Sequence, residues 1–194
     1  ELYGHLDALN VDLKGFTDEF YRHTCGARLD PVLETLEYLC HETDLWFEIT
    51  TLLIPGRNDG DAELHELAGW VAEHLGPEVP LHFTAFHPDF KMRDTPPTPP
   101  ATLTRARRIA QHSGLRFVYT GNVHDAAGQS TYCAACGELL IGRNWYTLSE
   151  YAVENGCCKQ CGHRLNGHFD ARPGTFGARR VRQITPADIR ASAR

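Results

Sequence analysis

A chain of 194 residues with 42% hydrophobic and 23% charged residues has the composition of a soluble globular protein, with room for one fair-sized domain or two small ones. Its formal net charge of −6 gives no reason to expect nucleic acid as the main partner. No apolar run reaches the roughly 20 residues that a membrane span requires, and the N-terminus shows no signal-peptide pattern.

The chain opens with a strand-like segment over residues 8–14. Its apolar and polar side chains alternate, so they fall on opposite faces: Leu9, Val11 and Leu13 on one, Asn10, Asp12 and Lys14 on the other. A short helix follows, with Thr17 as its expected cap. A longer helix starts at Asp30–Pro31, where proline suits the first helical position.

Strands and helices continue to alternate as far as residue 122. Three further strands are predicted at 45–56, 80–86 and 115–122. Between them lie one helix over 61–76, with Asp61 as a plausible N-cap, and another that begins at Thr102 or Thr104 and ends at Gly114. This alternation predicts right-handed crossovers and an α/β fold with four parallel strands and helices on one outer side, curved as part of a barrel.

The composition changes after Asn122. Residues 123–130 look like a linker, residues 131–169 form a cysteine-rich module, and residues 170–194 are a basic tail. The tail from residue 171 holds six Arg and one Asp, a composition that is most often a solvated extension.

Two Cys-x-x-Cys-Gly motifs, Cys133–Cys136 and Cys158–Cys161, are the most specific signal. Together they supply four thiolates and leave no open position, which predicts one structural zinc site. A rubredoxin-like iron site, or cysteines without metal, are the alternatives. Cys157 is a neighbouring candidate, but its x3 spacing to Cys161 makes Cys158 the better ligand. Seven cysteines without a secretion signal favour thiols and metal ligands in a reducing, cytoplasmic compartment.

Polar side chains also gather on the predicted strands and at their carboxyl ends. They are Asp12 and Lys14, then Glu48 and Thr50, then His82 and His87, and finally Asn122. Parallel strands bring their carboxyl ends to one edge of a sheet, which is the usual ligand site of such folds. A carboxylate, an ammonium and an imidazole at this edge could hold an amino-acid-like or nucleoside-like ligand.

Several segments, taken with the paired Cys-x-x-Cys motifs, resemble radical SAM proteins related to pyruvate formate-lyase activating enzymes: DALNVDLKGF, LLIPGRND, PLHFTAFHPDFK, TP and GLRFVYTGNV. The most similar subgroup is that of the AmmeMemoRadiSam system, and the resemblance extends to about Phe169. It implies a partial (β/α) barrel over residues 1–122, followed by a zinc-ribbon-like module. It also implies that Asp12 and Lys14 contact S-adenosylmethionine and that His87 lies near the methionyl end of this cofactor.

Two features depart from that family. Its [4Fe–4S] cluster is held by a Cys-x3-Cys-x2-Cys loop, and this chain contains no such motif. We therefore expect the chain to be the C-terminal part of such an enzyme, inactive alone, with the cluster ligands upstream of Glu1. In addition, Glu48 or Thr50 stands near the place where activating enzymes use an arginine.

The function implied by the resemblance is the generation of a 5′-deoxyadenosyl radical from S-adenosylmethionine to modify an unknown substrate, a protein backbone glycine being one option. The implied partners are a protein substrate, Memo-like and AMMECR-like proteins, and a reductant for the cluster. The alternative is a non-enzymatic zinc-ribbon adaptor or scaffold. The sequence upstream distinguishes them, because a Cys-x3-Cys-x2-Cys motif there supports the enzyme.

Overall fold

The computed structural model describes residues 5–174, so most of the predicted basic tail lies outside the described residues. Four strands form a parallel sheet in the order β1-β2-β3-β4: β1 (Ala8–Asp12), β2 (Trp46–Leu53), β3 (Leu81–Ala85) and β4 (Val118–Gly121). The predicted α/β fold with four parallel strands is confirmed.

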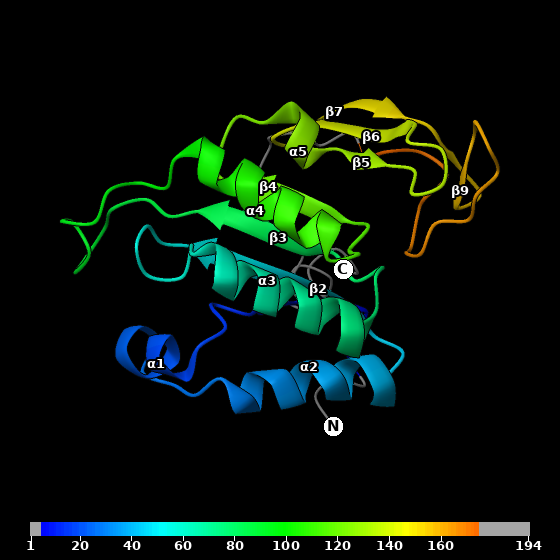
Figure 1. The fold of residues 1–194 in the computed structure, drawn as a ribbon. Helices are drawn as coiled ribbons and strands as arrows, with labels where there is room; N and C mark the ends of the chain where they lie inside the picture. Colours follow the sequence, from blue (N-terminus) through cyan, green and yellow to red (C-terminus); the bar gives the residue numbers. More distant parts are fainter. Residues whose placement is uncertain (1–4, 175–194) are drawn as a thin grey trace, which may run out of the picture.

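The connecting helices lie on one face of this sheet. Figure 1 shows α2 (Asp30–Glu42), α3 (Asp61–Trp70) and α4 (Pro100–His112) side by side in front of the strands. A short α1 (Asp18–Phe20) runs into a π-helical turn, η2 (Tyr21–Cys25), and α3 continues into a second one, η3 (Val71–Leu75). Helices on a single face are the arrangement of a (β/α) barrel segment, whereas a doubly wound sheet carries helices on both faces.

Helix starts differ slightly from the expectation. The N-cap of α3 is Gly60, so Asp61 is the first helical residue and its carboxylate lies in the first turn. Helix α4 begins at Pro100, two residues before Thr102, because proline at the first helical position needs no hydrogen-bonded N–H.

The main core lies between the sheet and these helices. Along β2, Phe47, Ile49, Thr51 and Leu53 are buried, while the residues between them are half-buried on the opposite, open face. Leucines from α2, α3 and α4 complete this core, namely Leu36, Leu39, Leu64, Leu67 and Leu103. Each fully buried side chain of this size contributes about 1.5–3 kcal/mol.

The segment predicted as a linker contains a helix, α5 (Ala126–Gln129). The Asp125 carboxylate caps it by accepting a hydrogen bond from the Gly128 N–H at 2.9 Å, and it also accepts one from the Thr120 hydroxyl of β4 at 2.9 Å. The connection between sheet and module is therefore bonded to the sheet.

The cysteine-rich module is built from short antiparallel strands. β5 (Thr131–Tyr132), β6 (Leu139–Asn144) and β7 (Thr147–Tyr151) form one sheet, and β8 (Val153–Glu154) pairs with β9 (Cys157–Cys158). A second core joins Phe117, just before β4, to apolar residues of the module, namely Leu140, Ile141, Val153 and Leu165.

Residues 5–174 include no helix with both the length and the apolar character to cross a bilayer.

Candidate functional site

The end of β1 places two opposite charges at the carboxyl edge of the sheet. The Lys14 ammonium lies 2.9 Å from the Asp12 carboxylate, and both side chains are more than a third exposed. The Lys14 backbone N–H donates to the Tyr21 hydroxyl at 3.0 Å. Burial raises the pKa of Tyr21 to about 12, so this acceptor remains a neutral phenol at neutral pH.

The next two residues fix the direction of the chain after Lys14. A Cβ on Gly15 would lie 2.7 Å from the Phe20 ring, so only glycine fits without movement. The Phe16 N–H donates to the Glu63 carboxylate of α3 at 2.7 Å. The segment DLKGF is thus held at Lys14 by the bond to Tyr21 and at Phe16 by the bond to Glu63 of α3.

Two buried polar residues join the carboxyl ends of β1, β2 and β3. Asn58 donates to the backbone carbonyls of Lys14 at 2.6 Å and Leu52 at 2.9 Å, and accepts from the Ile54 N–H at 2.7 Å. The Thr98 hydroxyl donates to the Leu53 carbonyl at 2.6 Å and accepts from the Phe86 N–H at 2.9 Å.

Asn122 extends this connection to the fourth strand. Its side chain donates to the Ala85 carbonyl of β3 at 3.2 Å, and its own backbone is left-handed, with a φ of 60°. Asparagine tolerates this conformation better than most residues. The predicted site residue thus serves here as a bridge between β4 and β3.

His87 lies two residues beyond β3 and is exposed. Among residues 5–174 the hydrogen-bond partner of its ring is the Pro88 carbonyl, at 3.5 Å, and the ring makes no hydrogen bond or ion pair with Asp12 or Lys14. β3 is two strands from β1, which corresponds to about 10 Å across the sheet. A ligand would have to bridge that span, so the shared role of these three residues stays a prediction.

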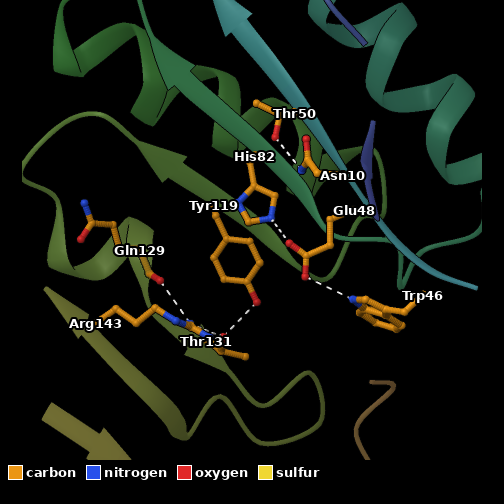
Figure 2. A network of polar contacts seen from close by, with 9 residues as sticks. All are labelled: Asn10, Trp46, Glu48, Thr50, His82, Tyr119, Gln129, Thr131 and Arg143. Carbon is orange, nitrogen blue, oxygen red and sulfur yellow. Dashed lines mark hydrogen bonds and ion pairs between the residues drawn. The ribbon is translucent and has the colours of Figure 1, made fainter. Parts of the chain in front are cut away.

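The open face of the sheet carries a polar network that the sequence pattern only partly indicated (Figure 2). The Glu48 carboxylate lies 2.7 Å from the His82 Nε2 and accepts from the Trp46 indole at 3.3 Å. The hydrogen bond from His82 holds the pKa of Glu48 below its ordinary value, although burial acts in the opposite direction. The His82 ring stacks on Tyr119, with centroids 4.9 Å apart.

Tyr119 links this network to the module. Its hydroxyl lies 2.9 Å from the Thr131 hydroxyl, which accepts a 2.7 Å hydrogen bond from Nη1 of Arg143. The same Nη1 donates to the Gln129 carbonyl at 3.3 Å, and the guanidinium lies 5.8 Å from the centre of the Tyr119 ring. Arg143, on β6, therefore sits over the open face of the sheet.

Two cavities lie between the open face and the module. The larger measures about 550 Å³ and the smaller about 350 Å³, and Glu48, Tyr119 and Arg143 line both. Volumes of this size suit small-molecule ligands.

The four cysteines singled out in the sequence lie together. Their sulfurs are all within 4.8 Å of one another, with 3.7 Å between Cys133 and Cys161 and 3.8 Å between Cys136 and Cys158. Tetrahedral Zn–S bonds of about 2.3 Å require sulfurs about 3.8 Å apart, so this donor set fits zinc. Cys157 does not belong to the group, and its thiol points to the Asn155 carbonyl at 3.8 Å.

The two motifs contain the same kind of backbone turn. In the first, the Gly137 N–H donates to the Cys133 carbonyl at 2.9 Å; in the second, the Gly162 N–H donates to the Cys158 carbonyl at 2.8 Å. Both glycines have positive φ, 77° and 75°, a conformation that other residues rarely adopt. The repeat Cys-x-x-Cys-Gly is thus explained by two equivalent turns that face one centre.

Sequence reasoning missed Asn58, Thr98, Tyr119, Thr131 and Arg143. Asn58 lies inside the quoted segment LLIPGRND, which carried a signal for the loop but not for the role of one side chain. Arg143 and Thr131 lie on short strands of the module, where the cysteine spacing carries no signal for these two side chains.

No family model matches the chain. A protein of Methanocaldococcus jannaschii, described as uncharacterized, is 44% identical over 163 residues, which cover 83% of this chain and 48% of that protein. The chain therefore spans about half the length of this curated relative.

Among solved structures, a domain of pyruvate-formate lyase-activating enzyme from Bacteroides vulgatus matches with a TM-score of 0.54. The match covers 62% of this chain and 71% of that domain at 17% sequence identity. At that identity the likeness concerns the fold. The chain shares at a coarse level the fold of a domain from an activating enzyme.

Proposed function

We propose that this chain is part of a radical SAM enzyme of the pyruvate formate-lyase-activating type, in the AmmeMemoRadiSam subgroup. The observation that carries the proposal is the carboxyl edge of the sheet, where Asn58 and Thr98 fix the strand ends and the Asp12–Lys14 pair stands exposed. The coarse fold shared with an activating-enzyme domain supports it.

The residues at this edge fit S-adenosylmethionine by charge. The cofactor ends in an ammonium and a carboxylate, which the Asp12 carboxylate and the Lys14 ammonium complement. His87, across the edge, is the third proposed contact. When bound beside a reduced [4Fe–4S] cluster, S-adenosylmethionine supplies a 5′-deoxyadenosyl radical that abstracts hydrogen from a substrate. The protein residues hold and orient the cofactor.

The iron–sulfur cluster needs ligands other than the cysteines of the module. The chain has no Cys-x3-Cys-x2-Cys motif, and the grouped sulfurs form a set of four without an open position. We assign that set to structural zinc, with iron as the alternative that colour would reveal, and place the cluster ligands on a segment outside these 194 residues.

The substrate class stays open in this proposal, with a protein as one option. Memo-like and AMMECR-like proteins are the proposed partners, together with a reductant for the cluster, in the cytoplasm. The other candidate, an adaptor built on the four-cysteine module, is favoured only by the grouped sulfurs.

The test uses the complete gene product, reconstituted anaerobically with iron and sulfide. With dithionite and S-adenosylmethionine, we expect 5′-deoxyadenosine, detected by chromatography. A complete sequence without the three-cysteine cluster motif, and no 5′-deoxyadenosine, would overturn the enzyme in favour of the adaptor.

Substitution of Lys14 tests the cofactor site directly. Lys14→Ala removes one charge-assisted hydrogen bond, which is worth about 1.5–3 kcal/mol, so S-adenosylmethionine should bind about ten- to a hundredfold more weakly by calorimetry. Lys91→Ala is the matched control, since Lys91 is exposed in the loop after β3 and contacts the Phe90 ring. Equal affinities for the two variants would contradict the role of Lys14.

A further inference from the structure

Arg143 presents two hydrogen-bond donors that the described residues leave unused. Nη1 is occupied by the Thr131 hydroxyl and the Gln129 carbonyl, whereas Nε and Nη2 have no hydrogen-bond partner within residues 5–174. Nor does the guanidinium form an ion pair with Glu48, whose two oxygens are bound to His82 and Trp46. The guanidinium is thus fixed in place by one nitrogen while the opposite pair stays available.

The smaller cavity is lined by this guanidinium and by residues at the carboxyl end of β4. Its lining includes His82, Tyr119 and Asn122 from the sheet and Arg143 and Trp145 from the module. The two halves of the chain therefore build one cavity, and neither half has all of its walls.

Trp145 is an exposed aromatic wall that the structure holds in position. It is 44% exposed, and its backbone is left-handed, with a φ of 55°. Its N–H donates to the Gln129 side chain at 3.0 Å and its indole N–H donates to the His124 ring at 2.9 Å. A large apolar ring kept at a cavity wall, at some cost in backbone energy, offers a flat surface for stacking.

We propose that the smaller cavity binds a ligand with a carboxylate or phosphate group, which pairs with Nε and Nη2 of Arg143, and with a flat body that stacks on Trp145. The planar guanidinium edge matches two oxygens of such a group, giving a bidentate pair. Glu48 also lines this cavity, and both of its carboxylate oxygens are already hydrogen-bonded, one to the His82 ring and one to the Trp46 indole. Identifying this ligand with the substrate of the enzyme rests on the proposed function, but binding itself does not.

The first test is a titration of the ¹⁵N-labelled chain, purified without chelator and without S-adenosylmethionine. The probes are phenyl phosphate and phenylacetate, with benzyl alcohol as the uncharged control. We expect saturable shifts of the Arg143 Nε–H and Trp145 indole N–H signals with the anions, and little change with the alcohol. The anion that binds more tightly identifies phosphate or carboxylate as the preferred group. If both signals stay unmoved at millimolar anion, the proposal is wrong.

The second test compares two Arg→Lys variants. Arg143→Lys keeps the charge but loses the planar fork, so the preferred anion should bind about tenfold more weakly or worse. Arg108→Lys is the matched control, because Arg108 is exposed on α4, on the helical side of the sheet. Equal losses in both variants would overturn the assignment. Should Arg143→Lys fail to fold, judged by circular dichroism and metal content, the titration of the unsubstituted chain decides alone.

Failure of this inference and failure of the proposed function are distinguishable. Anion binding at Arg143 without any 5′-deoxyadenosine from the complete gene product would retain the cavity as a ligand site and remove the radical chemistry. Formation of 5′-deoxyadenosine without anion binding would do the reverse.

Discussion

Single buried polar side chains hold the carboxyl edge of this sheet. Asn58 is 2% exposed and Thr98 is 5% exposed, and each bonds backbone groups on two different strand ends. Burying such polar side chains is costly unless every polar atom has a hydrogen-bond partner. Here the partners are backbone groups at the strand ends, which these bonds hold in place. The loops that carry Lys14 and His87 therefore start from fixed points.

Replacing Asn58 tests this at the level of one residue. Asn58→Ala would leave the buried Ile54 N–H and two carbonyls without their partner, so we expect a loss of about 2–4 kcal/mol in the free energy of unfolding. Asn10→Ala is the matched control, since Asn10 is exposed and makes one bond, to Thr50 at 2.9 Å. It should cost less than about 1 kcal/mol. Urea denaturation measures both, and comparable losses would refute the role of Asn58.

Glu48 provides a second test at this scale through its titration. Its pKa lies below the ordinary value chiefly because His82 donates a hydrogen bond to it. His82→Phe keeps a ring against Tyr119 but removes the bond and the charge, while burial remains. The pKa of Glu48, followed by carboxyl ¹³C NMR, should therefore rise in this variant.

The lowered pKa of Glu48 also makes the stability of the fold depend on pH. The pKa of Glu48 is lower in the folded chain than in the unfolded chain. Its ionised carboxylate therefore stabilises the fold at pH values above the ordinary pKa, and this contribution disappears as the pH falls through the folded pKa. Glu48→Gln should accordingly destabilise the chain near neutral pH, and its stability should converge with that of the unsubstituted chain in acid.

For the His82→Phe variant, an unchanged titration of Glu48 would show that another group sets the pKa of Glu48.

At the scale of elements, the sequence predicts the long strands and helices but not the short helix that depends on a tertiary contact. The run of apolar and β-branched residues along 45–56 predicts β2, and Pro31 predicts the start of α2, because both depend on local sequence. Helix α5 is four residues long and depends on a cap, Asp125, that also bonds Thr120. Its glycine and alanines resemble a linker in sequence, so only the tertiary contact reveals it.

The cysteine-rich module is the element that we expect to depend most on a bound ion. Its core within the described residues has few large apolar side chains, and a unit of about 40 residues usually needs a metal or disulfide. Zinc held by four thiolates contributes on the order of 10 kcal/mol to folding. We therefore expect folding of residues 131–169 to be coupled to metal.

Serine substitutions separate the ligands from their neighbour. Cys136→Ser should lower the metal content measured by mass spectrometry and speed amide hydrogen exchange over residues 131–169, while β1–β4 keep their protection. Cys157→Ser is the matched control, because Cys157 adjoins the motif but lies outside the group of sulfurs. Loss of metal in Cys157→Ser, with retention in Cys136→Ser, would reverse the ligand assignment.

At the scale of the whole molecule, the module is packed on the sheet and completes its open face. Arg143 of β6 reaches Tyr119 of β4 through Thr131, and this approach creates both cavities. No periodic pattern in the sequence encodes it, because the orientation of the module depends on the turn at α5 and on packing around Phe117. The fold class and the grouping of the four cysteine sulfurs could thus be predicted from local spacing, whereas this interface could not.

Phe117 should carry the coupling between sheet and module. It is 7% exposed and precedes β4, but its side chain packs with Leu140, Ile141 and Leu165 of the module. Phe117→Ala opens a cavity in that core, at a cost of about 3–5 kcal/mol. Because the lost contacts belong to the module, amide exchange should rise mainly over residues 131–169.

Phe86→Ala is the matched control for this coupling. Phe86 is also 7% exposed, yet it packs in the core between the sheet and its helices. In this variant exchange should rise over the sheet and helices while the module keeps its protection. Hydrogen-exchange mass spectrometry resolves the two patterns by peptide. If both variants loosen the sheet and the module equally, the molecule unfolds as a single unit and the two cores are not separable, contrary to the arrangement inferred here.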